Sequence, residues 1–297
     1  MRILDYITRF SNEESCKDYF YRIRLKQGVI CKRCNSEKHY WLSNRAQFEC
    51  SKCKFRTTLR SGTVMENSRL SFQTWFLIFF LMTNTKKGLS AREMQRQIGH
   101  KRYTTIWAIM HRIREKMGKR DEKYILKDMI EFDEAYIEKA VPESIKSNLK
   151  RGKGSPRQAN VVVIAESIPL EDKKGKKSRF CGYFKMKVIP NGKAETIDQI
   201  LKQSIEEKTI VFTDKSTSYV NISDYVEVHI TEKSSPQTTK ETLQWVHIAI
   251  SNAKRTLLGI YHKINGKYLQ NYLDEFIYKL NRRYFYSLFD RLLIAVV

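Results

Sequence analysis

Four cysteines near the start of this 297-residue chain constrain its fold more than any other feature. They form two C-x-x-C pairs, whose members are Cys31, Cys34, Cys50 and Cys53. Four thiolates with this spacing close a tetrahedral shell around zinc and leave no coordination position open, so such a site is structural and not catalytic. The other two cysteines, Cys16 and Cys181, are isolated, which argues against a disulfide framework. The pairs therefore predict a small β module from Gly28 to Met65, with short strands between and after the pairs, held together by Zn²⁺.

The charge of the chain points to a polyanionic partner. With 55 Lys and Arg against 32 Asp and Glu, the net charge is +23. Residues 1–60 carry +8, residues 86–120 carry +9 and residues 143–193 carry +9, while the remainder sums to −3. A single basic run is usually a solvated face, but three separated basic segments favour a composite binding surface.

The apolar residues are numerous enough for a folded core but are not arranged for a membrane. Hydrophobic residues make up 41% of the chain, which excludes wholesale disorder. The longest apolar run, Trp75 to Met82, has 8 residues, far fewer than the roughly 20 that span a bilayer. The first ten residues also lack the apolar core of a secretory signal. We expect a cytoplasmic, nucleoid-associated protein with no membrane partner.

The segment after the zinc module is expected to be helical. Its three helices are predicted at Ser71 to Asn84, Ser90 to Ile98 and Tyr103 to Met117. Gly99 and His100 break the pattern between the second and third helix, which gives helix-turn-helix order. The residues around the start of the third helix are candidate DNA contacts: Lys101, Arg102, Tyr103 and Thr104. A three-helix bundle that does not read DNA can contain the same turn, so this segment alone leaves both interpretations open.

After an acidic helical connector from Asp121 to Lys127, the pattern alternates between strands and helices. Strands are expected at Met129 to Ile137, Asn160 to Ala165, Phe180 to Ile189, Thr209 to Thr213 and Tyr225 to Ile230, and helices at Ala194 to Ile205, Lys240 to Leu258 and Gly266 to Tyr284. A three-stranded meander followed by α, β, α, β, α is the order of the ribonuclease H-like fold. We therefore expect a multidomain α+β protein with a zinc-ribbon segment at 1–66, a helix-turn-helix DNA-binding region at 67–120, and a ribonuclease H-like α/β catalytic domain with C-terminal helices at 126–297.

Two aspartates are the candidate catalytic groups. Asp133 lies inside the first predicted strand of the α/β region, and Asp214 directly follows the predicted strand that ends at Thr213. If these strands are neighbours, the two carboxylates share a site, where a divalent cation such as Mg²⁺ offsets their repulsion and supports phosphoryl transfer. An Asp at a strand end is more often a turn residue, so spacing alone leaves that alternative open.

At this point the chain resembles a known family. The zinc ribbon and the phrases Phe132 to Ile137, Val211 to Tyr219 and Ala253 to Phe276 look like those of DDE-type insertion-sequence transposases with an N-terminal zinc ribbon, the group numbered fifteen-ninety-five. The resemblance implies a polynucleotidyl transferase that cuts and joins DNA at transposon ends. It assigns Asp133 and Asp214 as the first two catalytic aspartates, holding Mg²⁺ or Mn²⁺. Because two ends must be brought together, it also implies a homodimer or higher oligomer on DNA.

The third catalytic position departs from the acidic triad of this family. Relatives carry Glu, Asn or sometimes His seven residues before a Lys, and here His247 precedes Lys254 by seven residues. Residues with this spacing project from one helix face within roughly 20° and lie about 10.5 Å apart along the axis. We expect His247 to contact the metal site and Lys254 to contact a flanking phosphate, although each could instead be an ordinary helix residue. Glu241 is the competing carboxylate, and Glu134, on the opposite strand face from Asp133, is not expected to be a ligand.

Further basic residues are candidates for backbone contacts to DNA. They are Lys150, Arg151, Lys153, Arg157, Lys254 and Arg255, together with the loop from Lys173 to Lys177. Two other functions remain open from the sequence. One is a DNA-binding regulator built from the zinc ribbon and the helix-turn-helix, with an inactive catalytic domain. The other is a structure-specific ribonuclease H-like nuclease.

Overall fold

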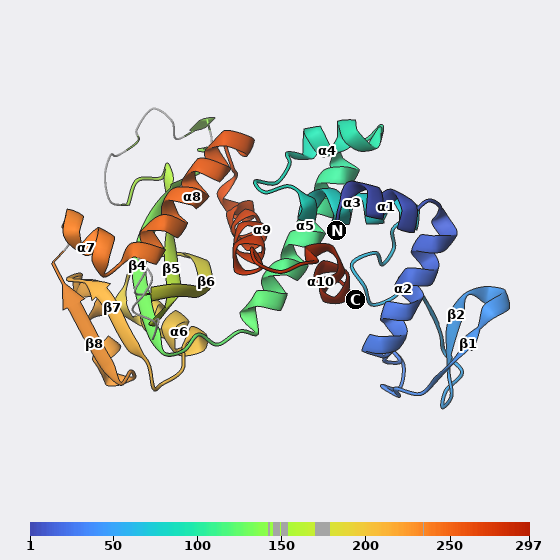
Figure 1. Cartoon of the computed structure of the whole chain (residues 1–297), viewed down its shortest axis with the longest axis horizontal. Coiled ribbons are helices and arrows are strands. Elements are labelled where there is room, and N and C mark those ends of the chain that lie inside the picture. The colour runs from blue at the N-terminus through green and yellow to red at the C-terminus, as the bar shows by residue number, and fades with distance from the viewer. Residues whose placement is uncertain (142, 145–148, 150–153, 170–178, 234) are drawn as a thin grey trace. The chain divides into compact units, whose positions relative to one another are not determined.

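Figure 1 shows the computed structural model of the chain, which describes residues 1–141, 143–144, 149, 154–169, 179–233 and 235–297. The chain divides into two compact units. The first unit comprises Met1–Met117 and Tyr284–Val297, and the second comprises Gly118–Arg283. The zinc module and the helices that the sequence predicts as separate segments therefore lie in one unit, and they are joined there by the last residues of the chain.

The zinc module is a three-stranded antiparallel sheet. Its strands, in the spatial order β1-β2-β3, are β1 (His39–Leu42), β2 (Gln47–Cys50) and β3 (Arg56–Thr58). Trp41 lies opposite Phe48 in the β1–β2 register, and the two ring centroids are 4.7 Å apart. Tyr21, from the helix that precedes the module, packs on Trp41 with a centroid distance of 4.4 Å. A small aromatic cluster thus joins this sheet to the neighbouring helix.

Two helices that the sequence pattern does not predict precede the zinc module, α1 (Ile3–Arg9) and α2 (Glu13–Gln27). Asn12 caps α2 by accepting a hydrogen bond from the Ser15 amide at 2.8 Å. Gly28 ends the helix with a φ of 80°, a conformation that glycine adopts without steric cost. Cys16 lies on the inner face of α2 and is fully buried, which explains this isolated cysteine as a small apolar core residue.

The three predicted helices are present as α3 (Phe72–Asn84), α4 (Ala91–Ile98) and α5 (Tyr103–Glu122). Ser90 caps α4 by accepting from the Glu93 amide at 3.1 Å, and Gly99 ends it with a φ of 71°. α5 continues through Glu122, so the predicted helical connector from Asp121 to Lys127 is wrong beyond its first two residues. Across the described part of the chain, no helix combines the length and hydropathy that a membrane span requires.

The last helix of the chain, α10 (Leu288–Ala295), packs in the first unit, whereas the sequence interpretation assigns residues up to 297 to the catalytic domain. Phe289 is 2% exposed and contacts the rings of Tyr6, Phe10, Phe76 and Phe80. Tyr19 also donates a hydrogen bond to Asp290 at 2.7 Å. The apolar end of the sequence is therefore core material of the first unit, which explains its composition.

The second unit is built on a five-stranded mixed sheet with the spatial order β6-β5-β4-β7-β8. The strands are β4 (Met129–Glu138), β5 (Gln158–Pro169), β6 (Arg179–Ile189), β7 (Ile210–Asp214) and β8 (Val228–Glu232). β4, β5 and β6 pair antiparallel, whereas β7 pairs parallel with both β4 and β8. A meander that continues into parallel strands beside its first strand is the predicted ribonuclease H-like arrangement, so the fold-class prediction is confirmed.

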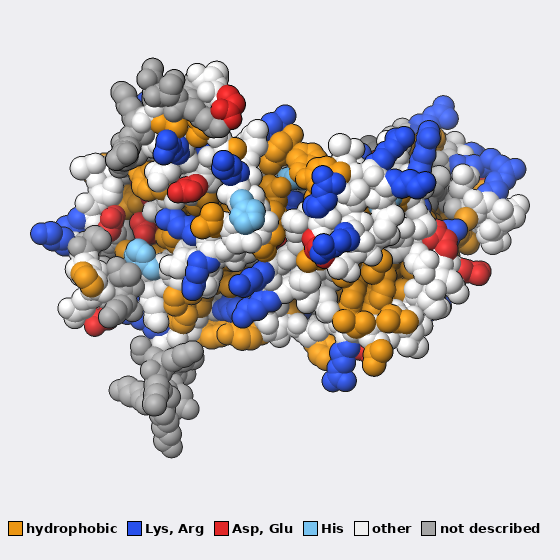
Figure 2. All heavy atoms as spheres, turned by 90° about the horizontal axis from the view of Figure 1, so that it is seen from above, with side chains coloured by type: hydrophobic (Ala, Val, Ile, Leu, Met, Phe, Trp, Pro, Cys, Tyr) orange, Lys and Arg blue, Asp and Glu red, His pale blue; other side chains and the backbone are white. Residues whose placement is uncertain are grey.

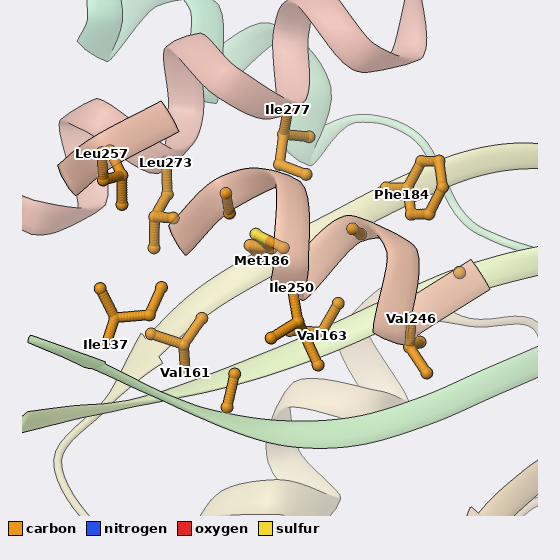
Figure 3. Close-up of a cluster of buried hydrophobic side chains, with 14 of the residues drawn as sticks. Ile137, Val161, Val163, Phe184, Met186, Val246, Ile250, Leu257, Leu273 and Ile277 are labelled. Atoms are coloured by element: carbon orange, nitrogen blue, oxygen red, sulfur yellow. The ribbon is translucent and has the colours of Figure 1, made fainter. Parts of the chain in front are cut away.

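Helices cover both faces of this sheet (Figure 1). They are α6 (Ala194–Ser204), α7 (Pro236–Glu241), α8 (Gln244–Tyr261) and α9 (Leu269–Asn281). One core lies between the sheet and helices α8 and α9, where Val163 and Ile250 face one another (Figure 3). The opposite core contains Phe132 and the α6 residue Ile197. Because strand residues alternate between faces, odd-numbered β4 residues, including Asp133, lie on the α8 face.

Besides shifts of a few residues at the ends of β5 and α9, two elements in this unit differ from the prediction. The helix predicted from Lys240 to Leu258 is two helices, because the chain leaves the helical conformation at Thr242 and Leu243 before α8 begins. The fifth strand begins at Val228 instead of Tyr225. Both differences lie next to short connections, where apolar periodicity carries the least information.

Asp274 on α9 is an inward-facing carboxylate outside the candidate site. Burial raises its pKa to about 7, and the hydrogen bond that it accepts from Gln270 at 2.8 Å opposes this shift. The pKa in the unfolded chain is near 3.8. Over the interval between these values the folded state binds more protons than the unfolded state, so the stability of the wild-type protein falls as pH rises.

Asp274→Asn is therefore expected to stabilise the protein more at about pH 8 than at about pH 5.5, by up to about 1.4 kcal/mol for each pH unit between about 5.5 and the folded-state pKa of about 7. The Asn side chain does not titrate and keeps an oxygen that accepts from Gln270. Urea unfolding of both proteins at the two pH values measures the difference. Asp224→Asn, at an exposed position of the same unit, is the control. A gain that is equal at both pH values would contradict this account.

Candidate active site

The register of the sheet brings the two predicted aspartates to the same level. In the parallel β4–β7 pair, Glu131 lies opposite Phe212. Continuing this register by two residues places Asp133 level with Asp214, the last residue of β7. Both side chains then share one face of the sheet, because positions two apart on a strand point to the same side. The predicted meeting of a mid-strand Asp with a strand-end Asp is thus reproduced in the structure.

Helix α8 brings His247 to the same place. The Nε2 atom of His247 lies 3.7 Å from Oδ2 of Asp133, and the His247 side chain is about one-third exposed. His247 lies in the first turn of α8, and α8 packs on the sheet over β4 and β5. The structure therefore unites Asp133 with the residue expected at the third catalytic position.

The surroundings of Asp133 disfavour its ionised form. Burial raises its pKa to about 7, and the negative charges of Asp214 and Glu134 add to this effect. A hydrogen bond from the Glu134 amide at 2.8 Å and the positive charge of Lys254 act in the opposite direction. A divalent cation would reverse the balance, because it favours the ionised form of every carboxylate that faces it. The donor set of two carboxylates and an imidazole suits Mg²⁺ or Mn²⁺.

The imidazole of His247 is suited to act as a neutral ligand. Burial lowers the pKa of His247, and the negative charge of Asp214 partly opposes this shift. A neutral imidazole keeps a lone pair for a metal ion, whereas a protonated one does not. Among the described residues, the four cysteines are the one group of three or more such side chains gathered closely enough to hold a single metal ion.

Lys254 and Arg255 follow His247 on α8 and are exposed. The charge of Lys254 lowers the pKa of Asp133, which places this ammonium within electrostatic reach of the site. The guanidinium of Arg255 instead bonds within its own helix, to the Ser251 carbonyl and to Oδ1 of Asn252. Of the two residues, Lys254 is better placed to meet a phosphate next to the site.

The structure adds one residue that sequence reasoning missed. Glu131 is fully buried, and its Oε2 atom accepts hydrogen bonds from the backbone amides of Trp245 at 2.6 Å and Val246 at 3.1 Å. These amides belong to the first turn of α8, immediately before His247. The sequence signal that could have identified Glu131 is a charged residue at an inward-facing position of β4, two residues before Asp133.

The two other acidic residues weighed from the sequence lie elsewhere. Glu134 is on the α6 face of β4, where its Oε1 atom accepts a hydrogen bond from the Tyr219 hydroxyl at 3.4 Å. Burial raises the pKa of Tyr219, and the nearby Glu134, Asp133 and Asp214 raise it further, so this hydroxyl acts as a donor. Glu241 is the exposed last residue of α7 and accepts from Gln237 at 3.3 Å.

The four cysteines of the zinc module fit a zinc ion. Their Sγ atoms all lie within 4.8 Å of one another, and the Cys31–Cys53 and Cys34–Cys50 pairs are each 3.5 Å apart. Sulfurs around tetrahedral zinc, with bonds of ~2.3 Å, are about 3.8 Å apart. The thiols are therefore gathered almost at ligand spacing, as the two C-x-x-C pairs predict.

The described candidate DNA contacts are solvent-exposed. Lys101, Arg102, Tyr103 and Thr104 are exposed around the start of α5, and Arg157 is exposed beside β5. Lys150, Arg151, Lys153 and the loop from Lys173 to Lys177 lie outside the described residues. On the face that Figure 2 shows, Lys and Arg side chains outnumber acidic ones on each unit. The accessible charge is thus of the sign that a nucleic acid requires.

Two protein families match this chain. The family described as ISXO2-like transposase domain matches residues 125–281, and the transposase zinc-ribbon domain matches residues 11–56. An uncharacterized protein in transposable element ISH50 of Halobacterium salinarum is 23% identical over 222 residues, which are 72% of this chain and 71% of that protein. The first match contains the mixed sheet and helices α6 to α9, and the second contains α2 and all four zinc-module cysteines.

Proposed function

The chain belongs to the ISXO2-like transposases, and from that premise we propose that it binds the ends of an insertion sequence and catalyses metal-dependent DNA cleavage and strand transfer. The observation that carries the proposal is the meeting of Asp133, Asp214 and His247 at one point of the sheet, with His247 3.7 Å from Asp133. This constellation is of the DDE type, with His at the third position. The resident cations would be Mg²⁺ or Mn²⁺, in addition to structural Zn²⁺.

Each residue of the site has a distinct task in this reaction. Asp133 and Asp214 hold the divalent cations, which when bound supply an activated water or 3′-hydroxyl and stabilise negative charge on the phosphate. The neutral imidazole of His247, on α8, would supply a nitrogen lone pair to a cation and orient the scissile phosphate against the sheet. Lys254 binds a flanking phosphate as a point charge, and so helps to place the DNA strand along α8.

The exposed basic residues hold the DNA on which this site acts. We assign Lys101, Arg102, Tyr103 and Thr104 to the transposon end, and Arg157, Arg255 and the basic loops to the DNA backbone. Two ends must be joined to one target, so the active form is a homodimer or higher oligomer on DNA, associated with the nucleoid.

The test is a cleavage and joining assay on DNA that carries the terminal sequences of the element. With Mg²⁺ or Mn²⁺, the full-length protein is expected to nick the end DNA and then join the freed 3′ end to a second duplex. Binding without cleavage would indicate a regulator instead. Cleavage without joined products would indicate a structure-specific nuclease.

His247→Ala is expected to slow single-turnover cleavage on the order of a hundredfold, because a ligand that acts at the reacting phosphate is lost. His247→Glu is expected to keep substantial activity with Mg²⁺, because it restores a carboxylate at this position. Leu258→Ala, on an exposed part of the same helix, is the control. Full activity of His247→Ala would remove His247 from the site.

A further inference from the structure

A buried carboxylate outside the proposed ligand set connects the strand of Asp133 to the helix of His247. Glu131 is 0% exposed and lies two residues before Asp133, on the same face of β4. Its Oε2 atom accepts hydrogen bonds from the amides of Trp245 at 2.6 Å and Val246 at 3.1 Å. A single side chain thus bonds a central strand to the start of a helix more than a hundred residues later.

These contacts replace a cap that α8 lacks. The first amides of a helix have no partner within the helix and are usually satisfied by a side chain just before it. The residue before α8 is Leu243, which makes no side-chain cap hydrogen bond. Glu131 supplies the missing acceptor from β4, and its carboxyl group lies at the positive end of the helix dipole.

This cap fixes α8 at the point where it passes the acidic site. His247 directly follows Val246, and its Nε2 atom lies 3.7 Å from Asp133. The strand residue that holds the helix and the strand residue that faces the imidazole are therefore only two positions apart. A displacement of about 1 Å in such a site costs up to about a hundredfold in rate.

We propose that Glu131 is a positioning residue: by capping α8 from β4, it holds His247 within reach of Asp133. This inference rests on the proposed cleavage function and deepens it, because it names the group that orients the third member of the site. Glu131 acts through α8 and does not contact the reacting atoms.

The chain contains a matched control for a merely structural role. Glu166 is 5% exposed and also accepts two backbone hydrogen bonds, from Lys127 at 3.1 Å and Tyr183 at 2.7 Å. Neither partner belongs to α8. Removal of either carboxylate leaves two backbone amides without their side-chain acceptor, but only the loss of Glu131 releases the helix that carries His247.

The experiment compares Glu131→Ala, Glu131→Gln and Glu166→Ala in the full-length, zinc-loaded protein. Glu131→Ala is expected to lower single-turnover cleavage at saturating end DNA by on the order of thirty- to a hundredfold, with DNA affinity unchanged within about twofold. Glu131→Gln is expected to lie between it and the wild type, because the amide oxygen still accepts. Glu166→Ala is expected to stay within about threefold of the wild type.

Two further measurements separate positioning from general destabilisation. Amide hydrogen exchange in the peptide from Leu243 to Ile250 is expected to accelerate in Glu131→Ala and not in Glu166→Ala. In a His247→Ala background, adding Glu131→Ala is expected to lower the rate by less than about threefold, because both changes remove the same contribution.

Wild-type cleavage by Glu131→Ala, equal losses in Glu131→Ala and Glu166→Ala, or unchanged exchange at the start of α8 would each overturn the proposal. If the wild-type protein cleaves no end DNA, the proposed function fails instead. The exchange comparison does not depend on activity and still decides whether Glu131 holds α8, so the two failures are distinguishable.

Discussion

Replacement of Asp133 or Asp214 by Asn is expected to abolish DNA cleavage while leaving DNA binding intact. The two carboxylates lie level on neighbouring strands, and an Asn has no charge with which to hold a divalent cation between them. We expect a loss of at least about a thousandfold in the single-turnover rate, because the site acts as a unit. Gel-shift and cleavage assays on the same end DNA measure the two properties separately. Unaltered cleavage by an Asp214 variant would refute the catalytic assignment as a whole.

Asp133→Asn is expected to stabilise the fold, although it abolishes cleavage. In the metal-free protein this carboxylate is buried, and its charge is repelled by Asp214 and Glu134. Asn keeps the oxygen that accepts from the Glu134 amide and removes the charge. We expect a gain of about 1–3 kcal/mol in the free energy of unfolding. Asp224→Asn, at an exposed position of the same unit, is the control and is expected to change neither property.

Removal of zinc is expected to unfold the zinc module and to leave the second unit folded. The three strands of the module are short, and four cysteine sulfurs gathered for the ion hold them together beside a small aromatic cluster. In isolated zinc modules the binding free energy is about 10–16 kcal/mol and is equivalent to folding free energy. Cys50→Ala or a strong chelator should therefore eliminate the bound zinc and the near-ultraviolet dichroism of Trp41 and Tyr21.

Cys181→Ala is the matched control, because Cys181 is an isolated, buried cysteine of the second unit. It is expected to keep one zinc ion per chain by metal analysis and to leave the aromatic signals unchanged. Stoichiometric zinc in Cys50→Ala would contradict a four-cysteine site. Loss of the sheet of the second unit on chelation would contradict the independence of the two units.

The sequence predicted the features that have strong local signals. The cysteine spacing predicted the zinc module, and apolar periodicity predicted α3, α4 and most of the mixed sheet. The resemblance to insertion-sequence transposases with a zinc ribbon is confirmed by both family matches. The sequence also predicted that Asp133 and Asp214 lie close together. This prediction needed only the strand order, because the register of β4 and β7 sets the level of both residues. The roles of His247 and Lys254 came from the resemblance and stay predictions.

Other features could not be predicted because their cause lies far away in the chain. α2 has local end signals at Asn12 and Gly28, but it is rich in charged residues, and its buried face, with Cys16 and Phe20, is defined by packing in the first unit. The start of α8 is capped by Glu131, from a strand more than a hundred residues earlier. The packing of α10 depends on rings close to the N-terminus. No local pattern encodes such contacts.

The position of α10 also sets an order of events during synthesis. Phe289 lies among Tyr6, Phe10, Phe76 and Phe80, so the core of the first unit is complete only after the residues of the second unit have been made. A ribosome therefore releases the mixed sheet for folding while the first unit still lacks its last helix. A chain cut short after Arg283 keeps every residue of the proposed catalytic site and leaves the rings around Phe289 without their partner in the unit that carries the zinc ribbon and helices α3 to α5.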